Sequence, residues 1–455
     1  MKPTWNFSCK RLADYKSERP DMSKKISRLL GLLGLVTLLV GSLFPDNRVA
    51  ASIEQAAAAR TGNARSAAIV ATTDAILKET SELRKLSILR NVKSGAQSRA
   101  DIEKMILKNL DEETTPAEMH ATELLLRKFG LAAADFQYRA SIVKLLTEQV
   151  AGYYDPKAQQ FYLADWIDLD GQKPVMAHEL THALQDQHFN LRRFQKWPKG
   201  DSDAELAAHA LIEGDATLAM MQYLSKNPMV ALAFVRSLGG ENASSEQLKQ
   251  TPRAIRESLL FPYEAGSAWA TQIYRRGGWQ LVSEAFQRLP LSSEQIIHVD
   301  KYFTYEAPVK VTVPEVKNLL GTGWSRVDYD VNGEWGYYLI LDQFINDATL
   351  SKRAAAGWAG DRYALYEEPQ SGQALILQLT VWDSAQDARE FFNAYARRTD
   401  RRYSNAKKTT LSPDVNEWQT SEGDVLLELK ASRVLIIEGL PGKANKKELL
   451  RALWW

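Results

Sequence analysis

Apolar residues recur at intervals of three and four between about residues 51 and 149, a stretch rich in Ala, Leu, Lys and Glu. This spacing is typical of amphipathic helices, so it predicts a helical region. Thr115 and Pro116 mark the start of one helix, with Thr115 as its N-cap. The region indicates a scaffold, or a linker before Ile102, and leaves open whether it covers a cleft as a pro-segment.

The pattern changes at residue 150, where aromatic and β-branched residues replace the helical spacing. Two short strand-like runs, 150–154 and 160–163, flank the turn-forming residues Asp155, Pro156 and Lys157. This arrangement predicts a β-hairpin directly before the segment that carries the candidate chemistry.

A third pattern begins at about residue 313, where strand-like and helix-like runs follow one another without regular βαβ alternation. It predicts a small α+β domain with no catalytic role, in which aromatic residues such as Trp382 and Phe391 form the core. The predicted helices cover residues 333–346, 384–398 and 446–453, and the predicted strands cover 363–366, 374–382, 425–430 and 434–438.

The N-terminus carries a candidate export signal. Lys24, Lys25 and Arg28 precede an apolar run over residues 29–44, which is followed by the small-residue sequence Val-Ala-Ala-Ser at 49–52. A basic start, a short apolar core and such a cleavage pattern are typical of a secretory signal peptide. An uncleaved N-terminal anchor is the alternative, and both predict a protein exported to the periplasm or the cell exterior. The hydrophilic residues before Met22 suggest that translation starts there.

Composition narrows the function classes. The chain has 455 residues, of which 45% are hydrophobic, and a net charge of +1. A balanced charge gives no reason to expect nucleic acid as a partner. The single cysteine, Cys9, excludes an intramolecular disulfide framework and a cysteine-based zinc module, so a metal site here must use His and carboxylate ligands.

These patterns together predict an α+β protein with a mainly helical catalytic domain. Its length favours more than one domain. The predicted parts are an N-terminal extension with signal peptide or anchor at 1–51, a helical region at 52–149, a catalytic domain at 150–312 and the small α+β domain at 313–455.

The most informative motif is H-E-x-x-H at His178, Glu179 and His182. On a helix, residues four apart project from nearly the same face, so the two imidazoles can bind one ion. Glu179 is displaced around the helix and stands where a general base can activate water beside the metal. The neighbouring residues are apolar, as expected for a helix beneath an active-site cleft, and we favour a Zn²⁺ site over a buried helix with two hydrogen-bonded histidines.

A catalytic zinc ion needs a third protein ligand and an open position for water. Glu213 lies on a predicted second helix, 31 positions after His182, and Gly214 beside it allows a close helix approach. Glu213 is therefore the predicted third ligand. His209 shares its helix face and is the competitor, whereas Asp215 is better suited to orient an imidazole N–H.

This segment resembles the zincin metallopeptidases. The H-E-x-x-H motif with a later Glu213 in an E-G-D-A setting is similar to the gluzincin branch, to which thermolysin-like enzymes belong. The longer form, H-E-L-T-H-A-L-Q-D-Q-H-F followed by E-G-D-A, is similar to a family of exported bacterial proteins. The match covers roughly residues 152–305 and implies that the hairpin supplies an edge strand along which an extended peptide lies. Thermolysin-like enzymes have a different sequence around the third ligand, so the resemblance does not carry the substrate preference.

Peptide hydrolysis also needs a donor for the oxyanion, in addition to the metal. His298, in a loop-like stretch, is the favoured candidate, and Tyr263 is the second. His188 is expected at a helix end or on the surface. The predicted function is zinc-dependent hydrolysis of peptide or protein substrates, with Glu179 as general base. The alternatives are a catalytically silent binding or chaperone-like protein of the cell envelope and a hydrolase of non-peptide amides or esters.

Overall fold

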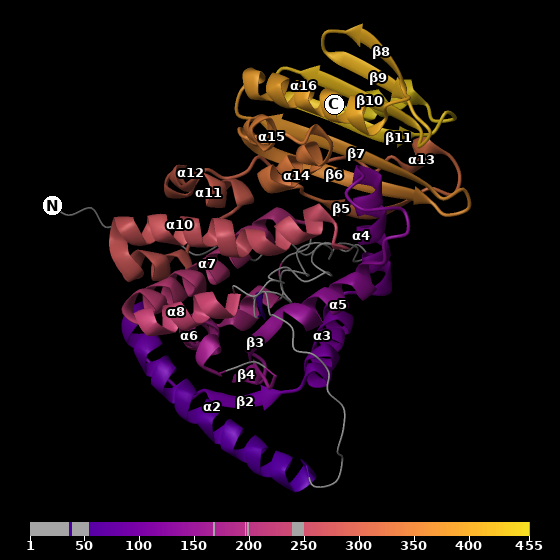
Figure 1. Ribbon diagram of the computed structural model, residues 1–455. Helices are drawn as coiled ribbons and strands as arrows, with labels where there is room; N and C mark the ends of the chain where they lie inside the picture. Colours follow the sequence, from indigo (N-terminus) through magenta and orange to yellow (C-terminus); the bar gives the residue numbers. More distant parts are fainter. Residues whose placement is uncertain are drawn as a thin grey trace, which may run out of the picture.

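The structure is a computed structural model that describes residues 36–38, 54–166, 169–195, 197, 200–238 and 250–454 (Figure 1). The predicted signal peptide or anchor, with Cys9 and Met22, lies outside the described residues except for the three-residue strand β1 (Val36–Leu38). Among the described residues, no helix has the length and apolar character needed to cross a membrane.

Helices fill the N-terminal region, as the spacing of its apolar residues predicts. Thr115 is the N-cap of the third of these helices, where its side chain and that of Glu118 form a capping box. Phe129 and its neighbours on the same face are buried. The helices are α2 (Glu54–Arg84), α3 (Arg99–Glu113), α4 (Pro116–Phe129) and α5 (Tyr138–Gln149).

The N-terminal half of the chain also forms a four-stranded sheet with the order β1-β3-β4-β2. The predicted hairpin is present as the antiparallel strands β3 (Val150–Asp155) and β4 (Gln160–Ala164). The strand β2 (Lys93–Gln97) runs parallel to β4. The outer side of β3 pairs antiparallel with β1, so the hairpin lies inside the sheet and β3 is not its edge strand.

The helix α6 (Leu169–Phe189) carries the H-E-x-x-H motif through the interior of the protein. Its residues from 171 to 186 are almost all buried, because strands β3 and β4 and helix α2 contribute to an apolar cluster around it and α7 packs beside it. The helices that follow are α7 (Ser202–Lys226), α8 (Pro228–Leu238), α10 (Arg253–Ala285), α11 (Ser293–Ile297) and α12 (Val299–Thr304), with a short 3₁₀ helix, η1 (Leu191–Gln195).

Two glycines allow α7 and α10 to touch backbone to backbone. A Cβ atom on Gly214 would lie 2.2 Å from the carbonyl carbon of Gly266, and one on Gly266 would lie 2.2 Å from the carbonyl oxygen of Ala210. No side chain fits at such distances. The sequence predicts a close helix approach at Gly214, and the structure identifies α10 as the partner helix.

The C-terminal part is a seven-stranded antiparallel sheet with the order β5-β6-β7-β11-β10-β9-β8. All the predicted elements of this part are present, whereas β5, β8 and β9 were not predicted. The elements are α13 (Lys317–Leu320), β5 (Ser325–Asp330), α14 (Gly333–Ile345), α15 (Ala348–Ala355), β6 (Trp358–Glu368), β7 (Gln373–Trp382), α16 (Ala385–Arg402), β8 (Lys407–Ser412), β9 (Val415–Gln419), β10 (Asp424–Lys430), β11 (Arg433–Leu440) and α17 (Lys446–Leu453).

The two faces of this sheet have different partners. On one face, Trp382 stacks on Phe391 of α16, and the same apolar cluster continues into α3, α4 and α5 of the N-terminal region. On the other face, Leu377 and Ile437 pack with Leu449 of α17. The sheet and the N-terminal helices therefore share one core, and the predicted α+β fold class is confirmed.

Candidate metal centre

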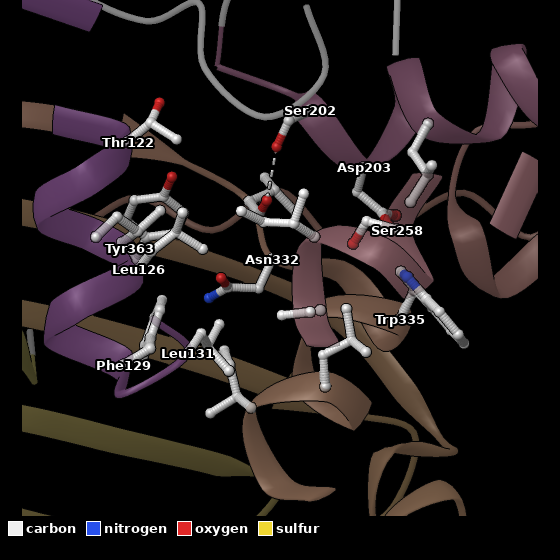
Figure 2. A pocket seen from close by; sticks show the side chains of 18 of the residues that line it. Thr122, Leu126, Phe129, Leu131, Ser202, Asp203, Ser258, Asn332, Trp335 and Tyr363 are labelled. Carbon is white, nitrogen blue, oxygen red and sulfur yellow. Dashed lines mark hydrogen bonds between the residues drawn. The ribbon is translucent and has the colours of Figure 1, made fainter. Parts of the chain in front are cut away.

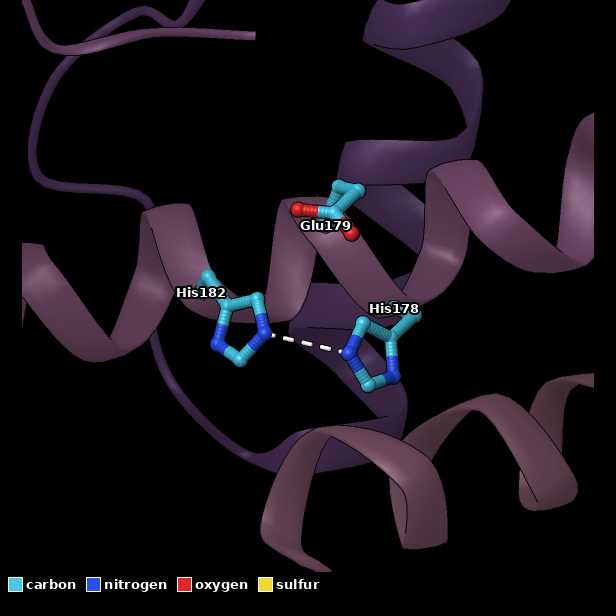
Figure 3. Close-up of side chains that lie close together, drawn as sticks. All are labelled: His178, Glu179 and His182. Atoms are coloured by element: carbon cyan, nitrogen blue, oxygen red, sulfur yellow. Dashed lines mark hydrogen bonds between the residues drawn. The ribbon is translucent and has the colours of Figure 1, made fainter. Parts of the chain in front are cut away.

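Helix α6 brings the motif residues together in the interior. His178, Glu179 and His182 are each at most 1% exposed. The Nε2 atoms of the two imidazoles lie 3.1 Å apart, and Figure 3 shows both rings on one side of the helix with Glu179 displaced from them. The spacing of four residues therefore produces the convergence that the sequence predicts.

Glu213 on α7 completes a compact group of three donor atoms. Its Oε2 lies 3.1 Å from His178 Nε2 and 3.4 Å from His182 Nε2, and the side chain is 1% exposed. Three corners of a tetrahedron around a zinc ion, with bonds of about 2.0–2.1 Å, lie about 3.3–3.4 Å apart. The three atoms thus form a triangle close to the size that zinc requires, and two nitrogens and one carboxylate oxygen are a donor set that zinc accepts.

Two carboxylates compete for the third position. Donor atoms of Glu179 and the two histidines all lie within 4.8 Å of one another, so Glu179 could also contribute a ligand. We favour Glu213, because a single oxygen of its carboxylate lies within 3.4 Å of both Nε2 atoms. Glu179 is instead held by β3, where the backbone N–H of Tyr154 donates to its Oε2 at 2.9 Å.

The competitor His209 lies one turn before Glu213 on α7. It is 3% exposed, and its Nδ1 has no hydrogen-bond partner in the described part of the chain. Burial lowers the pKa of His209 to about 4, so the ring is neutral at physiological pH. Glu213 Oε2 lies within 3.4 Å of both imidazoles of α6, which favours Glu213 over His209 as the third ligand.

The three candidate ligands influence one another's protonation. Burial alone would lower the pKa of His182, but the charge of Glu213 and its hydrogen bond raise it to about 9. Burial alone would raise the pKa of Glu213, but the charge of His182 and the bonds from both imidazoles hold it at about 2. For His178, burial lowers the pKa. The carboxylate therefore stays ionised and attracts positive charge to the centre of the triangle.

Gln185, one turn after His182, determines which imidazole nitrogen carries the proton. Its Nε2 donates to the carbonyl of Ile212 at 3.0 Å and to Asp215 Oδ2 at 2.8 Å. Because both partners only accept, the amide orientation is fixed and Oε1 must face His182 Nδ1, which lies 2.9 Å away. His182 Nδ1 therefore donates, and Nε2 is the nitrogen that faces the triangle and would bind a metal in its deprotonated form.

Asp215 does not contact the His182 imidazole directly in the described hydrogen bonds, but acts through Gln185. The sequence predicts that it orients an imidazole N–H directly, whereas the structure places Gln185 between Asp215 and His182. Arg84 from the end of α2 pairs with Asp215 on the other side. Gln185 could have been found from its position three residues after His182, but no local pattern marks Arg84, which is separated from Asp215 by 131 positions.

The two candidate oxyanion donors lie in different places. Tyr263 on α10 has its ring centroid 6.0 Å from that of His178. Burial raises the pKa of Tyr263 well above its usual value, and the nearby charges of Glu213 and Glu179 add to the effect, so the hydroxyl keeps its proton. It lies three residues before Gly266, so the close contact of α7 with α10 brings it to the site.

His298, the favoured candidate from the sequence, caps the end of α11 away from this triangle. Its Nε2 lies 2.9 Å from Glu334 Oε1 on α14, and this hydrogen bond raises its pKa. It lines a groove of about 530 Å³ between α10, α11, α14 and α15. None of the candidate metal ligands lines that groove, so the structure does not bring His298 together with the motif. His188 lies at the end of α6, as expected, and contacts the carbonyl of Ser87.

A second cavity, of about 80 Å³, lies between α4, α7, α10 and α14 (Figure 2). Its wall is mostly apolar, with Leu126 and Phe129 on one side and Asp203, Ser258 and Trp335 on another. None of the candidate ligands lines it. The cavity is therefore separate from the candidate metal centre.

Comparison with known proteins gives one family match. Residues 319–450 match a domain of unknown function (DUF8575), a stretch that contains all seven strands of the C-terminal sheet and excludes the H-E-x-x-H motif. No curated protein and no solved structure matches the chain. The candidate metal centre thus stands on its own geometry.

Proposed function

We propose that this protein is a zinc-dependent metallopeptidase in which His178, His182 and Glu213 hold the metal. The observation that carries the proposal is the triangle of donor atoms, with sides of 3.1, 3.1 and 3.4 Å. A further support is Glu213 Oε1, a buried carboxylate oxygen without a hydrogen-bond partner in the described part of the chain, because such groups are rare in interiors without a ligand.

Zinc held in this way would lower the pKa of a bound water to about 7 and polarise the scissile carbonyl. Glu179 is the residue that receives the proton of the attacking water. Its carboxylate is oriented by the N–H of Tyr154 on β3, so the strand that lies along the site also fixes the base. Glu179 then delivers the proton to the leaving amine, which closes the proton balance of the reaction.

Tyr263 is the residue that donates a hydrogen bond to the oxygen of the scissile carbonyl as its negative charge develops. A donor must remain protonated to act in this way, and the raised pKa of Tyr263 ensures that it does. His298 has no part in this step, because it is bonded to Glu334 in the separate groove.

A peptide is favoured over other acyl substrates by the neighbouring strand. The outer side of β3 pairs antiparallel with Val36–Leu38 from Val150 to Tyr153, so it binds an extended backbone, and a substrate peptide would take the place of β1 there. Main-chain pairing of this kind gives affinity for extended peptides irrespective of sequence. The same strand donates to Glu179, so a paired peptide would lie beside the base.

The test is peptide hydrolysis by the purified, zinc-loaded protein, measured with a mixture of fluorogenic peptides. We expect hydrolysis that a chelator abolishes and added Zn²⁺ restores. Glu179→Gln is expected to lower turnover roughly 10²–10⁴-fold, because it removes the general base. The zinc content of this variant, measured in parallel, should stay at the wild-type value. Bound zinc without peptide hydrolysis would favour a binding protein, and hydrolysis of esters alone would favour the non-peptide alternative.

A further inference from the structure

The last residue of α2 lies deep in the protein. Arg84 is 0% exposed, and its Nε and Nη2 donate to the two oxygens of Asp215 at 2.5 and 3.1 Å. Its Nη1 donates to Ser283 Oγ at 3.1 Å, and the guanidinium lies 4.5 Å from the ring centroid of Trp279. A planar, bidentate guanidinium fixes both the position and the rotation of the carboxylate it binds.

The pair continues as a hydrogen-bonded series into the metal centre. Asp215 Oδ2 accepts from Gln185 Nε2 at 2.8 Å, and Gln185 Oε1 lies 2.9 Å from His182 Nδ1. Every member of the series is fully buried, so water cannot replace a lost partner. A change at Arg84 therefore reaches His182 through two intermediate side chains.

We infer that Arg84 is a positioning residue for His182 and that α2 is a permanent part of the metal centre. This inference rests on the proposed function. Without Arg84, Asp215 loses the guanidinium that fixes the position and rotation of its carboxylate. A displaced carboxylate holds Gln185 less firmly, and the amide then no longer fixes the His182 ring. Removal of α2 would have the same effect, so α2 is not a pro-segment to be released.

A purely structural role is the competing explanation, because the loss of one partner of a buried ion pair destabilises a protein whatever else the pair does. The double variant Arg84→Met/Asp215→Leu separates the two roles. It replaces both charges with apolar groups of similar size, which restores stability in many buried pairs. It still removes the acceptor that orients Gln185, so the positioning role stays broken.

The experiment measures zinc affinity by competition with a chromophoric chelator, together with the visible spectrum of the Co²⁺-loaded protein and the thermal midpoint of the metal-free protein. We expect Arg84→Gln to lower both the midpoint and the zinc affinity, the latter roughly 10- to 100-fold. The double variant should regain most of the midpoint while its affinity remains low and its Co²⁺ spectrum altered. Wild-type affinity and spectrum in the double variant would overturn the inference.

Arg90→Gln is the matched control. Arg90 also comes from the N-terminal region and pairs with a carboxylate on α6, that of Asp186, but it is 35% exposed. Among the described residues, the side chain of Asp186 bonds to Arg90, Tyr154 and Leu191 and not to Gln185 or His182, so zinc affinity should stay at the wild-type value.

These readouts need no hydrolysis, so the two proposals can fail separately. A wild-type protein that binds no zinc would contradict the proposed function. A wild-type protein that binds zinc, with a double variant that binds it equally well, would contradict only the role of Arg84. N-terminal sequencing of the active, zinc-loaded protein gives an independent check. We expect its first residue to precede α2, and a fully active form that begins after Arg84 would also overturn the inference.

Discussion

In the part of the chain that the structure describes, two arginine–carboxylate pairs are completely buried, and their hydrogen-bond networks connect to different surroundings. Arg84–Asp215 lies beside the candidate metal centre, and Arg398–Glu438 lies between α16 and β11. In the second pair, Glu438 Oε1 accepts from Tyr395 and Arg398, and Oε2 accepts from Arg398 and Arg402. Burial alone would raise the pKa of Glu438, but the two guanidinium charges hold it below its usual value. This group of side chains satisfies its carboxylate internally.

The first pair instead continues through Gln185 to His182, whose Nε2 lies 3.1 Å from His178 Nε2 and 3.4 Å from Glu213 Oε2. His178 Nδ1, His209 Nδ1 and Glu213 Oε1 are buried without a hydrogen-bond partner among the described residues. Arg398 Nε of the second pair also lacks a hydrogen-bond partner among the described residues, so an unpaired buried atom does not by itself identify a site. The two pairs differ in what they connect to: Glu438 is surrounded by its own donors, whereas Asp215 leads to three candidate metal-binding atoms that lie within 3.4 Å of one another.

The largest expected effect is on stability and concerns the second pair, Arg398–Glu438. Arg398→Gln should lower the free energy of unfolding by about 3–5 kcal/mol, because it leaves a buried carboxylate short of one charge partner. Zinc affinity should not change, because no bond connects Glu438 to the metal centre. Chemical denaturation and chelator competition measure the two quantities. A fall in zinc affinity as large as that of Arg84→Gln would break the distinction between the two pairs.

A smaller effect, on turnover, is expected at the candidate metal centre. Tyr263→Phe removes the proposed donor to the oxyanion and should lower turnover about 10²–10³-fold, or about 3–4 kcal/mol, with zinc content unchanged. His298→Ala is the matched comparison, since the sequence favoured it for the same role, and it should leave turnover close to the wild-type value. Steady-state kinetics with a single peptide decides between them, and the reverse ranking of the two variants would refute the assignment of Tyr263.

The smallest expected effect concerns a buried acid with neutral partners. Asp361 accepts from the backbone N–H groups of Asn332 and Gly333 and from Trp358 Nε1. Without a direct guanidinium partner, burial raises its pKa to about 6, whereas the unfolded chain releases this proton near pH 4. The folded state therefore binds more protons between these values. The contribution of Asp361 to stability is complete below about pH 4 and lost as pH rises through 6.

This pH dependence can be isolated with Asp361→Asn, which cannot titrate. The difference in unfolding free energy between wild type and variant should decrease by about 1–3 kcal/mol between pH 4 and pH 7. Denaturation at a series of pH values in this range gives the difference directly, and other titrating groups cancel in it. A difference that increases with pH would show that Asp361 is ionised in the folded protein.

The sequence predicted the elements of the fold better than their assembly. Runs of aromatic, β-branched and other apolar residues located the hairpin at β3 and β4 and most of the C-terminal strands, because strands such as β3, β7 and β11 are buried along most of their length. The edge strand β8 was missed, since its residues are almost all exposed and carry no apolar alternation. The pattern also gave no sign that α3–α5 share a core with the C-terminal sheet, because such packing depends on residues far apart in the chain.

The residues of the candidate site also differ in how far the sequence predicts them. His178, Glu179 and His182 lie within one helix turn of each other, so helix geometry alone predicts their arrangement. Glu213 could be proposed from its spacing and from Gly214, although the glycine turned out to face α10. Arg84 could not be predicted, because its role depends on how α2 crosses α7. A residue that acts on a ligand through other side chains, and that is far from it in the sequence, leaves no local sequence pattern.

The most direct test of the central claim is X-ray absorption spectroscopy of the zinc-loaded protein, wild type and Glu213→Ala. We predict a four-coordinate site with nitrogen and oxygen ligands at about 2.0–2.1 Å and the scattering pattern of two imidazoles. Glu213→Ala should lose most of its bound zinc, while His209→Ala should give the wild-type spectrum. Absence of bound zinc in the wild type, or an unchanged spectrum in Glu213→Ala, would contradict the assignment.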